Sequence, residues 1–259
     1  MRYIIETNSP ENLRPYCDHI GTPRSLTDLF IVNSDHPIEV LRNIEGVISV
    51  EEDGDDEPTA SYDHWYQEII GLSPETDKTG AGVDVYVLDS VSFQHPEFED
   101  RLIQLYQSEK GDQRHTHGTA VSSLVGGKTL GIAPGCKIKH CGYNFRTSEA
   151  IKCFDIILDD YRKSPNPAVL NMSFVTRSIF YKKGLERLHE AGIILVAAAG
   201  NDGNSDQHIP AKLNTTVAVA AHGRVRRPAS FSSYGEVVDL WAPGSNMRAA
   251  SISGGEMWF

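Results

Sequence analysis

The chain has 259 residues, of which 40% are hydrophobic and 23% charged, as expected for a soluble globular protein with one sizeable α/β domain and a small second one. With 35 acidic against 24 basic residues, its formal net charge of -11 disfavours a phosphate backbone or an anionic membrane surface as partner. We therefore expect neither nucleic acid nor membrane binding. Residues 1–13 resemble neither a signal peptide nor a transmembrane span, so an intracellular location is expected.

The first 57 residues are predicted to form a small α+β unit. Its predicted elements are a strand over 2–7, a helix over 10–21, a strand over 28–34, a helix over 36–46 and a strand over 47–52. Pro37 and Gly46 mark the start and the end of the second helix. Residues 50–60 then place six carboxylates around one glycine, which is typical of a solvated linker. We expect a domain boundary after residue 57.

Residues 58–259 are predicted to form a larger α/β domain. It contains five short apolar runs, at residues 83–90, 136–141, 168–174, 192–200 and 215–221. Polar or helical segments separate these runs, a pattern that predicts a buried parallel sheet with crossover helices.

The four cysteines show no CxxC pair and no dense framework. They are Cys17, Cys136, Cys141 and Cys153. Buried free thiols are favoured over metal ligands or disulfides.

Three polar residues lie at or near the carboxyl ends of predicted strands, where the functional sites of parallel sheets are usually found. Asp89 ends the first apolar run, His117 opens a closely packed helix, and Asn201 follows a later run. Each alone also suits an ordinary role: a helix cap, a structural histidine and a turn asparagine. A dinucleotide site is disfavoured, because residues 89–96 contain no glycine.

Together, the motifs resemble one family. The stretches VYVLD, HGT, VLNMSF, VAAAGND and FSSYGEVVDLWAPG occur in the order found in subtilisin-like serine peptidases. The resemblance runs from about Trp65 to the last residue. Direct passage from SLVGG into KTLGIAPG is similar to the proteinase K branch. The resemblance implies a subtilisin-like parallel sheet with flanking helices.

The first unit resembles the family's inhibitory propeptide domain, a ferredoxin-like α+β fold that commonly ends in a strand like GVISVEED. It is expected to be an abbreviated version, with one strand between its two helices. The resemblance implies that this unit is an intramolecular partner of the peptidase domain.

The resemblance also implies roles for the site residues. Asp89 would orient His117, His117 would take a proton from a serine, and Asn201 would donate to the oxyanion. Ser173 and Phe174 would lie beside a polypeptide substrate, and Ala198, Ala199 and Gly200 would line an apolar pocket. No cofactor is implied. No metal site is expected, because Glu97 supplies one carboxylate, which is not a coordination shell.

Three residues depart from the family pattern. Val91 and Val175 stand where glycine is usual, so the backbone after Asp89 can take another path and the cleft can be narrower. Ala120 replaces a second histidine that is structural.

The chain stops just short of the expected Gly-Thr-Ser-Met-Ala segment that carries the nucleophile, and Ser251 and Ser253 lack its context. We expect a C-terminally incomplete peptidase that is inactive alone, with the missing segment as a possible separate chain. A covering helix is expected on the face where Met257, Trp258 and Phe259 converge.

Three interpretations therefore compete: a truncated or cleaved endopeptidase, a noncatalytic relative that binds peptides or shields a partner, and an unrelated α/β enzyme. Val91, Val175 and the missing serine favour the second, while the absent glycine-rich loop disfavours the third.

Overall fold

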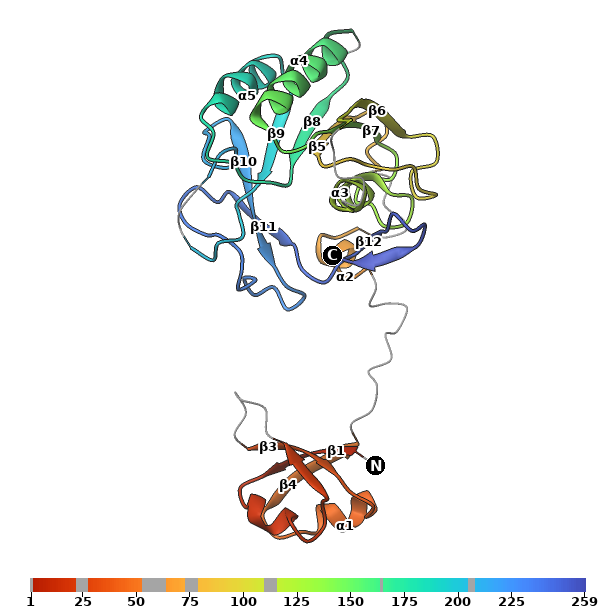
Figure 1. Cartoon of the computed structure of the whole chain (residues 1–259), viewed down its shortest axis with the longest axis vertical. Helices are drawn as coiled ribbons and strands as arrows, with labels where there is room; N and C mark the ends of the chain where they lie inside the picture. The colour runs from red at the N-terminus through yellow and green to blue at the C-terminus, as the bar shows by residue number, and fades with distance from the viewer. Residues whose placement is uncertain are drawn as a thin grey trace. The chain divides into compact units, whose positions relative to one another are not determined.

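The structure is a computed structural model of the chain. It describes residues 2–21, 28–52, 64–72, 79–109, 116–163, 165–204 and 208–259. The chain divides into two compact units, Met1–Pro58 and Thr59–Phe259, each of which is treated by itself (Figure 1). Most of the predicted acidic linker, from residue 53 onward, lies outside the described residues.

The first unit is a four-stranded antiparallel sheet with short helices. Its elements are β1 (Arg2–Thr7), the 3-10 helix η1 (Pro10–Leu13), β2 (His19–Gly21), β3 (Leu29–Asn33), α1 (Ile38–Arg42) and β4 (Val47–Glu52). The strand order β2-β3-β1-β4 interleaves two split β-α-β units, as in ferredoxin-like folds. The sheet and α1 enclose a core of their own, with Ile5, Leu13 and Leu41 fully buried.

The predicted helix over residues 10–21 is wrong. A single 3-10 turn forms at its start, and residues 19–21 form β2 instead. Pro15 explains the early end, because a proline has no N–H to donate to the preceding turn. Two strands, not one, therefore lie between η1 and α1. Pro37 precedes α1 as predicted, but α1 ends at Arg42 and not at Gly46.

The second unit is built on a seven-stranded parallel sheet in the order β11-β10-β9-β8-β5-β7-β6. Its strands are β5 (Asp84–Asp89), β6 (Leu102–Gln107), β7 (Lys137–Gly142), β8 (Ala168–Met172), β9 (Ile194–Ala198), β10 (Thr216–His222) and β11 (Leu240–Pro243). All five predicted strands are confirmed. The two that were not predicted, β6 and β11, are the edge strands. β6 includes two glutamines, and β11 is a run of only four partly exposed residues that ends in a proline.

Helices cover the two faces of this sheet unequally (Figure 1). α4 (Thr147–Lys163) and α5 (Phe180–Glu190) pack on one face, together with the alternate residues Tyr86 and Leu88 of β5. α3 (His117–Gly126) packs on the other face, against Val85 and Val87. Because successive side chains of β5 point to opposite faces of the sheet, this strand contributes residues to the hydrophobic core on each face. A short helix, α2 (Trp65–Ile69), precedes the sheet.

A hairpin of β12 (Arg248–Ala250) and β13 (Glu256–Trp258) closes the chain. Because strand residues alternate, Trp258 points away from its neighbours Met257 and Phe259. Its indole lies 5.0 Å from the guanidinium of Arg248 and is 52% exposed. The expected convergence of the three apolar residues on one face is therefore wrong.

Among the described residues, no helix has the length and apolar character needed to cross a lipid bilayer.

A buried charged group ties the central strands to α4. The Lys139 ammonium lies 2.9 Å from a carboxylate oxygen of Asp84 and 2.6 Å from one of Asp160. The hydroxyl of Tyr86 donates to the same oxygen of Asp160 at 2.8 Å. Since the side chain of Asp84 is 1% exposed, its charge depends on Lys139 for compensation.

Replacing Lys139 by methionine should lower the free energy of unfolding of the second unit by about 3 kcal/mol, because Asp84 would stay buried without its ion partner. All three tryptophans follow residue 58, so urea unfolding followed by tryptophan fluorescence reports on this unit alone. Lys182→Met is the control: it removes an exposed pair with Glu186 and should change stability by less than about 0.5 kcal/mol. Equal losses in both variants would contradict this account.

Candidate active site

The order of the strands creates a switch point at β5. From β5 the chain builds β6 and β7 on one side, and then β8, β9, β10 and β11 on the other. Loops at the carboxyl ends of the strands diverge at such a point and leave a crevice between them. Asp89 ends β5, Asn171 lies near the end of β8, and Asn201 follows β9.

Asp89 and His117 form a hydrogen-bonded pair at this point. Nδ1 of His117 lies 2.7 Å from Oδ1 of Asp89, which also accepts the backbone N–H of Ser90 at 2.6 Å. The Asp89 side chain is fully buried, whereas that of His117 is 34% exposed. A carboxylate bonded to Nδ1 fixes the imidazole in the tautomer whose Nε2 is free to accept a proton.

Gly118 lets α3 approach closely enough for this pair to form. A Cβ at this position would overlap the backbone carbonyl of Ser90. Its N–H donates to Oγ of Ser90 at 2.8 Å, and the buried hydroxyl of Thr119 accepts the N–H of Phe93 at 3.1 Å. The HGT motif therefore places the imidazole and fastens the start of α3 to the loop after β5.

Val91 does not disturb this geometry. Its side chain is fully buried, and its backbone is not in the left-handed region that favours glycine. The sequence left open whether Val91 would redirect the backbone after Asp89. The backbone that the structure shows there is compatible with the Asp89–His117 hydrogen bond.

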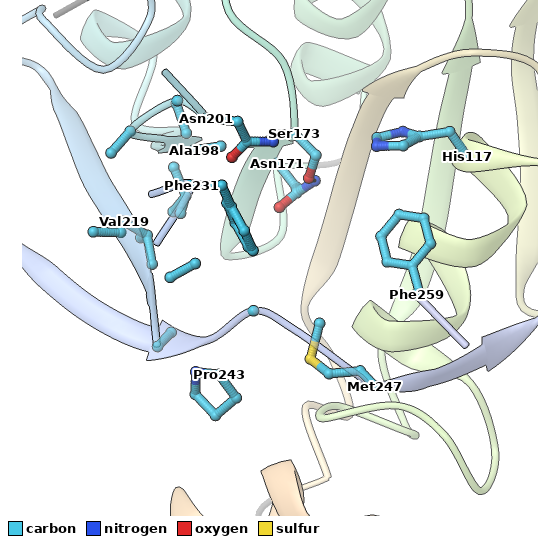
Figure 2. A pocket seen from close by; sticks show the side chains of 18 residues that line it. His117, Asn171, Ser173, Ala198, Asn201, Val219, Phe231, Pro243, Met247 and Phe259 are labelled. Carbon is cyan, nitrogen blue, oxygen red and sulfur yellow. The ribbon is translucent and has the colours of Figure 1, made fainter. Parts of the chain in front are cut away.

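A cleft of about 540 Å³ opens beside the imidazole (Figure 2). Predicted site residues line it: His117 from α3, Ser173 after β8, and Ala198, Ala199, Gly200 and Asn201 at the end of β9. Figure 2 shows Ser173 and Asn201 on the wall opposite His117. Ala199 and Gly200 are buried, while Asn201 is exposed.

Phe174 does not line this cleft. Its ring lies 5.7 Å from that of Tyr143 and 5.9 Å from that of Tyr181, between centroids, in an aromatic group beside the α4–α5 core. Successive side chains of an extended segment point to opposite sides, so Ser173 faces the cleft and Phe174 faces the aromatic group.

Other residues of the cleft were not assigned a role from the sequence. Asn171, Phe231, Met247 and Phe259 also line it. The Phe259 ring lies 5.2 Å from the imidazole of His117, between centroids (Figure 2). These two positions are 142 residues apart in the sequence, so no local sequence signal could have paired them.

An apolar groove of about 380 Å³ adjoins the cleft. Its walls come from the α3-facing side of β5, β8 and β9 and from α3 itself, through Val85, Val169, Val196 and Val121. Met247 and Phe259 line both hollows.

Comparisons with known proteins decide the family. A model described as "Subtilase family" matches residues 80–257, which include Asp89, His117, the cleft and the groove. The chain belongs to the subtilase family.

Its curated relatives include fungal proteases. It is 32% identical to Alkaline protease 1 of Aspergillus clavatus, over 83% of this chain and 59% of that protein. It is 33% identical to Proteinase R of Parengyodontium album, over 72% of this chain and 52% of that protein. The cuticle-degrading protease of Metarhizium anisopliae is 34% identical, over 70% of this chain and 52% of that protein.

A solved structure of a cold-adapted subtilisin-like serine proteinase is similar, with a TM-score of 0.65 and 27% identity over 72% of each chain. The second unit thus has a subtilisin-like α/β fold. The chain spans little more than half the length of the curated relatives it matches.

Opposing influences act on the imidazole of this subtilase. Burial, the largest, lowers the pKa of His117, but the hydrogen bond and the charge of Asp89 together raise it above its ordinary value. His117 therefore gains affinity for a proton from its partner.

Both carboxylate oxygens of Glu97 accept hydrogen bonds from the loop after α3. Oε2 accepts the backbone N–H groups of Thr129 and Leu130 at 2.9 and 3.0 Å, and Oε1 accepts the Thr129 hydroxyl at 2.7 Å. These bonds lower its pKa against the opposing effect of burial, which is the largest single influence. They fasten the loop after α3, so Glu97 has a structural role in the described part of the chain.

Replacing Asp89 by asparagine should lower the pKa of His117 below its ordinary value, because only the effect of burial would remain. The raised pKa contributes stability below about pH 6.5, and this contribution is lost as pH rises through the folded-state pKa. The destabilisation should therefore be larger at pH 5.5 than at pH 9. Histidine-ring NMR and urea unfolding at the two pH values measure these effects.

Asp202→Asn is the matched control, since it removes the carboxylate of an exposed pair with His208, which lies 2.8 Å away. It should leave the pKa of His117 unchanged. An unchanged His117 pKa in the Asp89 variant would show that the pair does not form in solution.

Proposed function

We propose that this subtilase is a serine endopeptidase that hydrolyses polypeptides, with Asp89 and His117 as two members of its triad. The observation that carries the proposal is the 2.7 Å hydrogen bond between them, made beside a cleft at the switch point of the sheet. A buried carboxylate behind a partly exposed imidazole is the arrangement that activates a hydroxyl nucleophile.

Each remaining group of the cleft has a role in this proposal. Asn201 would donate its side-chain amide to the oxyanion from the wall opposite His117. The segment after β8, with Ser173, would pair with the extended backbone of the substrate. Ala198, Ala199 and Gly200 are small, so they leave room for a side chain of the substrate beside the reacting carbonyl.

The nucleophilic serine, in this proposal, lies outside the 259 residues. Among the described residues, no serine hydroxyl forms a hydrogen bond with Nε2 of His117. Ser173 lines the cleft, but its Oγ accepts the side-chain amide of Asn171 at 3.0 Å. Ser251 and Ser253 bond to each other at 2.8 Å. The apolar groove offers walls for a further helix that would carry the serine, whether in the same chain or as a separate one.

Two experiments test the missing nucleophile. The coding sequence beyond Phe259 should specify Gly-Thr-Ser followed by small residues that open a helix. The 259-residue chain should not turn over a denatured protein or react with a fluorophosphonate probe, whereas the completed chain should do both. Sustained turnover by the 259-residue chain that disappears in His117→Ala would show that the serine lies within it, and Ser173→Ala would identify or exclude Ser173.

In the completed chain, Asp89→Ala and His117→Ala should each lower kcat by several orders of magnitude, and Asn201→Ala by about 10² to 10³. These magnitudes are known from subtilisin itself and are not deduced from this chain. Thr215→Ala, in the turn before β10, is a control that should retain activity. Full activity in the His117 variant would end the proposal.

We also propose that the first unit is the inhibitory propeptide of this peptidase, in an intracellular protein. Support comes from its position before the catalytic unit and from its independent core, which enables it to fold alone.

Residues 1–58, added to the completed catalytic unit, should inhibit hydrolysis in proportion to their concentration. Leu41→Asp is the control, because a charge at this fully buried site should unfold the unit and abolish inhibition. Absence of inhibition by the folded wild-type unit would refute this role without affecting the assignment of the triad.

One observation favours a noncatalytic peptide-binding relative as the second candidate. Val175 is 42% exposed at the rim, and its Cγ1 would lie 3.5 Å from a Cβ placed on Gly200, so it narrows the approach to this wall. The turnover assay on the completed chain separates the two candidates.

A further inference from the structure

Beneath the Asp89–His117 pair lie three buried polar atoms that form no hydrogen bond with any residue the structure describes. They are Oδ2 of Asp89, Oγ of Ser122 and Nε2 of His140. All three residues are fully buried. Native proteins pair nearly all such atoms, with protein groups or with internal water, so three of them close to a catalytic carboxylate require an explanation.

The strand register puts Asp89 and His140 on the same face of the sheet. In the parallel strands β5 and β7, Val87 pairs with His140 and Asp89 pairs with Gly142. Side chains at every second position share a face, so all four positions lie on the α3 side. Gly142 has no side chain, and a Cβ there would lie 3.4 Å from Cε1 of His140. Nothing from β7 therefore separates the imidazole from the carboxylate.

α3 places Ser122 over the same spot. Gly118 packs on the chain just after β5, and a Cβ on Gly126 would lie 2.9 Å from Cδ1 of Ile138 on β7. Ser122 is four residues from each glycine and so belongs to the same row of the helix. This row faces the sheet, and His140 is the next residue on that face after Ile138.

His140 is neutral and carries its proton on Nε2. Burial lowers its pKa to about 4, against the opposing charge of Asp89. The side-chain nitrogen of Gln104 on β6 lies 3.3 Å from Nδ1 of His140 and 2.7 Å from the carbonyl oxygen of Tyr106. This nitrogen is a donor, so Nδ1 accepts and Nε2 holds the hydrogen.

We propose that His140 is a positioning residue for the Asp89–His117 pair, its Nε2–H and the Ser122 hydroxyl donating to Oδ2 of Asp89 through one internal water. Such a water needs two to four polar partners, and three are present. Oδ1 is already held by Ser90 and His117. Holding Oδ2 as well fixes the rotation of the carboxylate and stabilises its charge. The inference rests on the proposed function, in which Asp89 orients a catalytic base.

The test measures the pKa of His117 by histidine-ring NMR in the 259-residue chain, which requires no catalysis. His140→Leu removes the donor, Ser122→Ala removes the hydroxyl, and His140→Gln keeps an N–H at the end of the side chain. The pKa of His117 should rise by about one pH unit in His140→Leu, because a less compensated carboxylate holds the imidazole proton more tightly. It should rise less in Ser122→Ala and return toward the wild-type value in His140→Gln.

His189→Leu on the exposed side of α5 is the matched control and should leave His117 unchanged. Asp89 is the charged group that acts on both His117 and His140, while Gln104 and Ser122 are uncharged, so the shift reports on the carboxylate.

An unchanged His117 pKa in folded His140→Leu and Ser122→Ala would overturn the proposal, even if both variants were less stable, since packing alone would explain that. If His140→Leu does not fold, the pKa of His117 in Ser122→Ala alone tests the proposal, and an unchanged value there would overturn it. A completed chain that hydrolyses nothing would refute the proposed function but leave the pKa comparison valid.

Discussion

The close packing of α3 on the carboxyl end of β5 is the constraint on which the rest of the second unit depends. Because Gly118 has no side chain, the first turn of the helix lies against the backbone after Asp89, and His117 comes within hydrogen-bond reach of the carboxylate. The same contact sets the row of α3 that faces β7 and leaves the α3-facing side of β8 and β9 to line the groove. The local geometry of one glycine thus governs both the Asp89–His117 pair and the shape of the groove beside it.

The fold could be predicted from the sequence where burial was complete. β5 and β7 to β10 are short apolar runs, since strands of a parallel sheet covered on both faces need little polar surface. The edge strands β6 and β11 were not predicted, because β6 includes two glutamines and is mostly exposed or half-buried, and β11 has only four residues, the last of them a proline. In the first unit, β2 has three residues, too few for a periodic signal, and Pro15 ended the helix that the apolar spacing indicated.

The site was predictable to the extent that chain order and strand ends determine it. Asp89 and Asn201 were selected because they follow strands whose carboxyl ends meet at one edge, and His117 because it opens a closely packed helix. Their roles came from the family resemblance and stay predictions. His140 and Ser122 could not be found in this way. In the sequence they are a polar residue within an apolar strand and a small residue within a packed helix. The strand register places His140 on the α3 side of the sheet, and the row of α3 that contains Gly118 and Gly126 places Ser122 toward the sheet. Phe174 was misplaced because it is adjacent to Ser173 in an extended segment, so the two side chains point to opposite sides and only one of them can face the cleft.

The position of β5 at the centre of the sheet also has a consequence for folding kinetics. Asp84 pairs with Lys137 on one side and with Ala168 on the other, 53 and 84 residues further along the chain. Contacts between such distant segments form only after long loops have closed, which slows folding and prolongs the exposure of unpaired strands. During synthesis, the strand that bears Asp89 emerges before either of its neighbours, and it stays unpaired until both have been made.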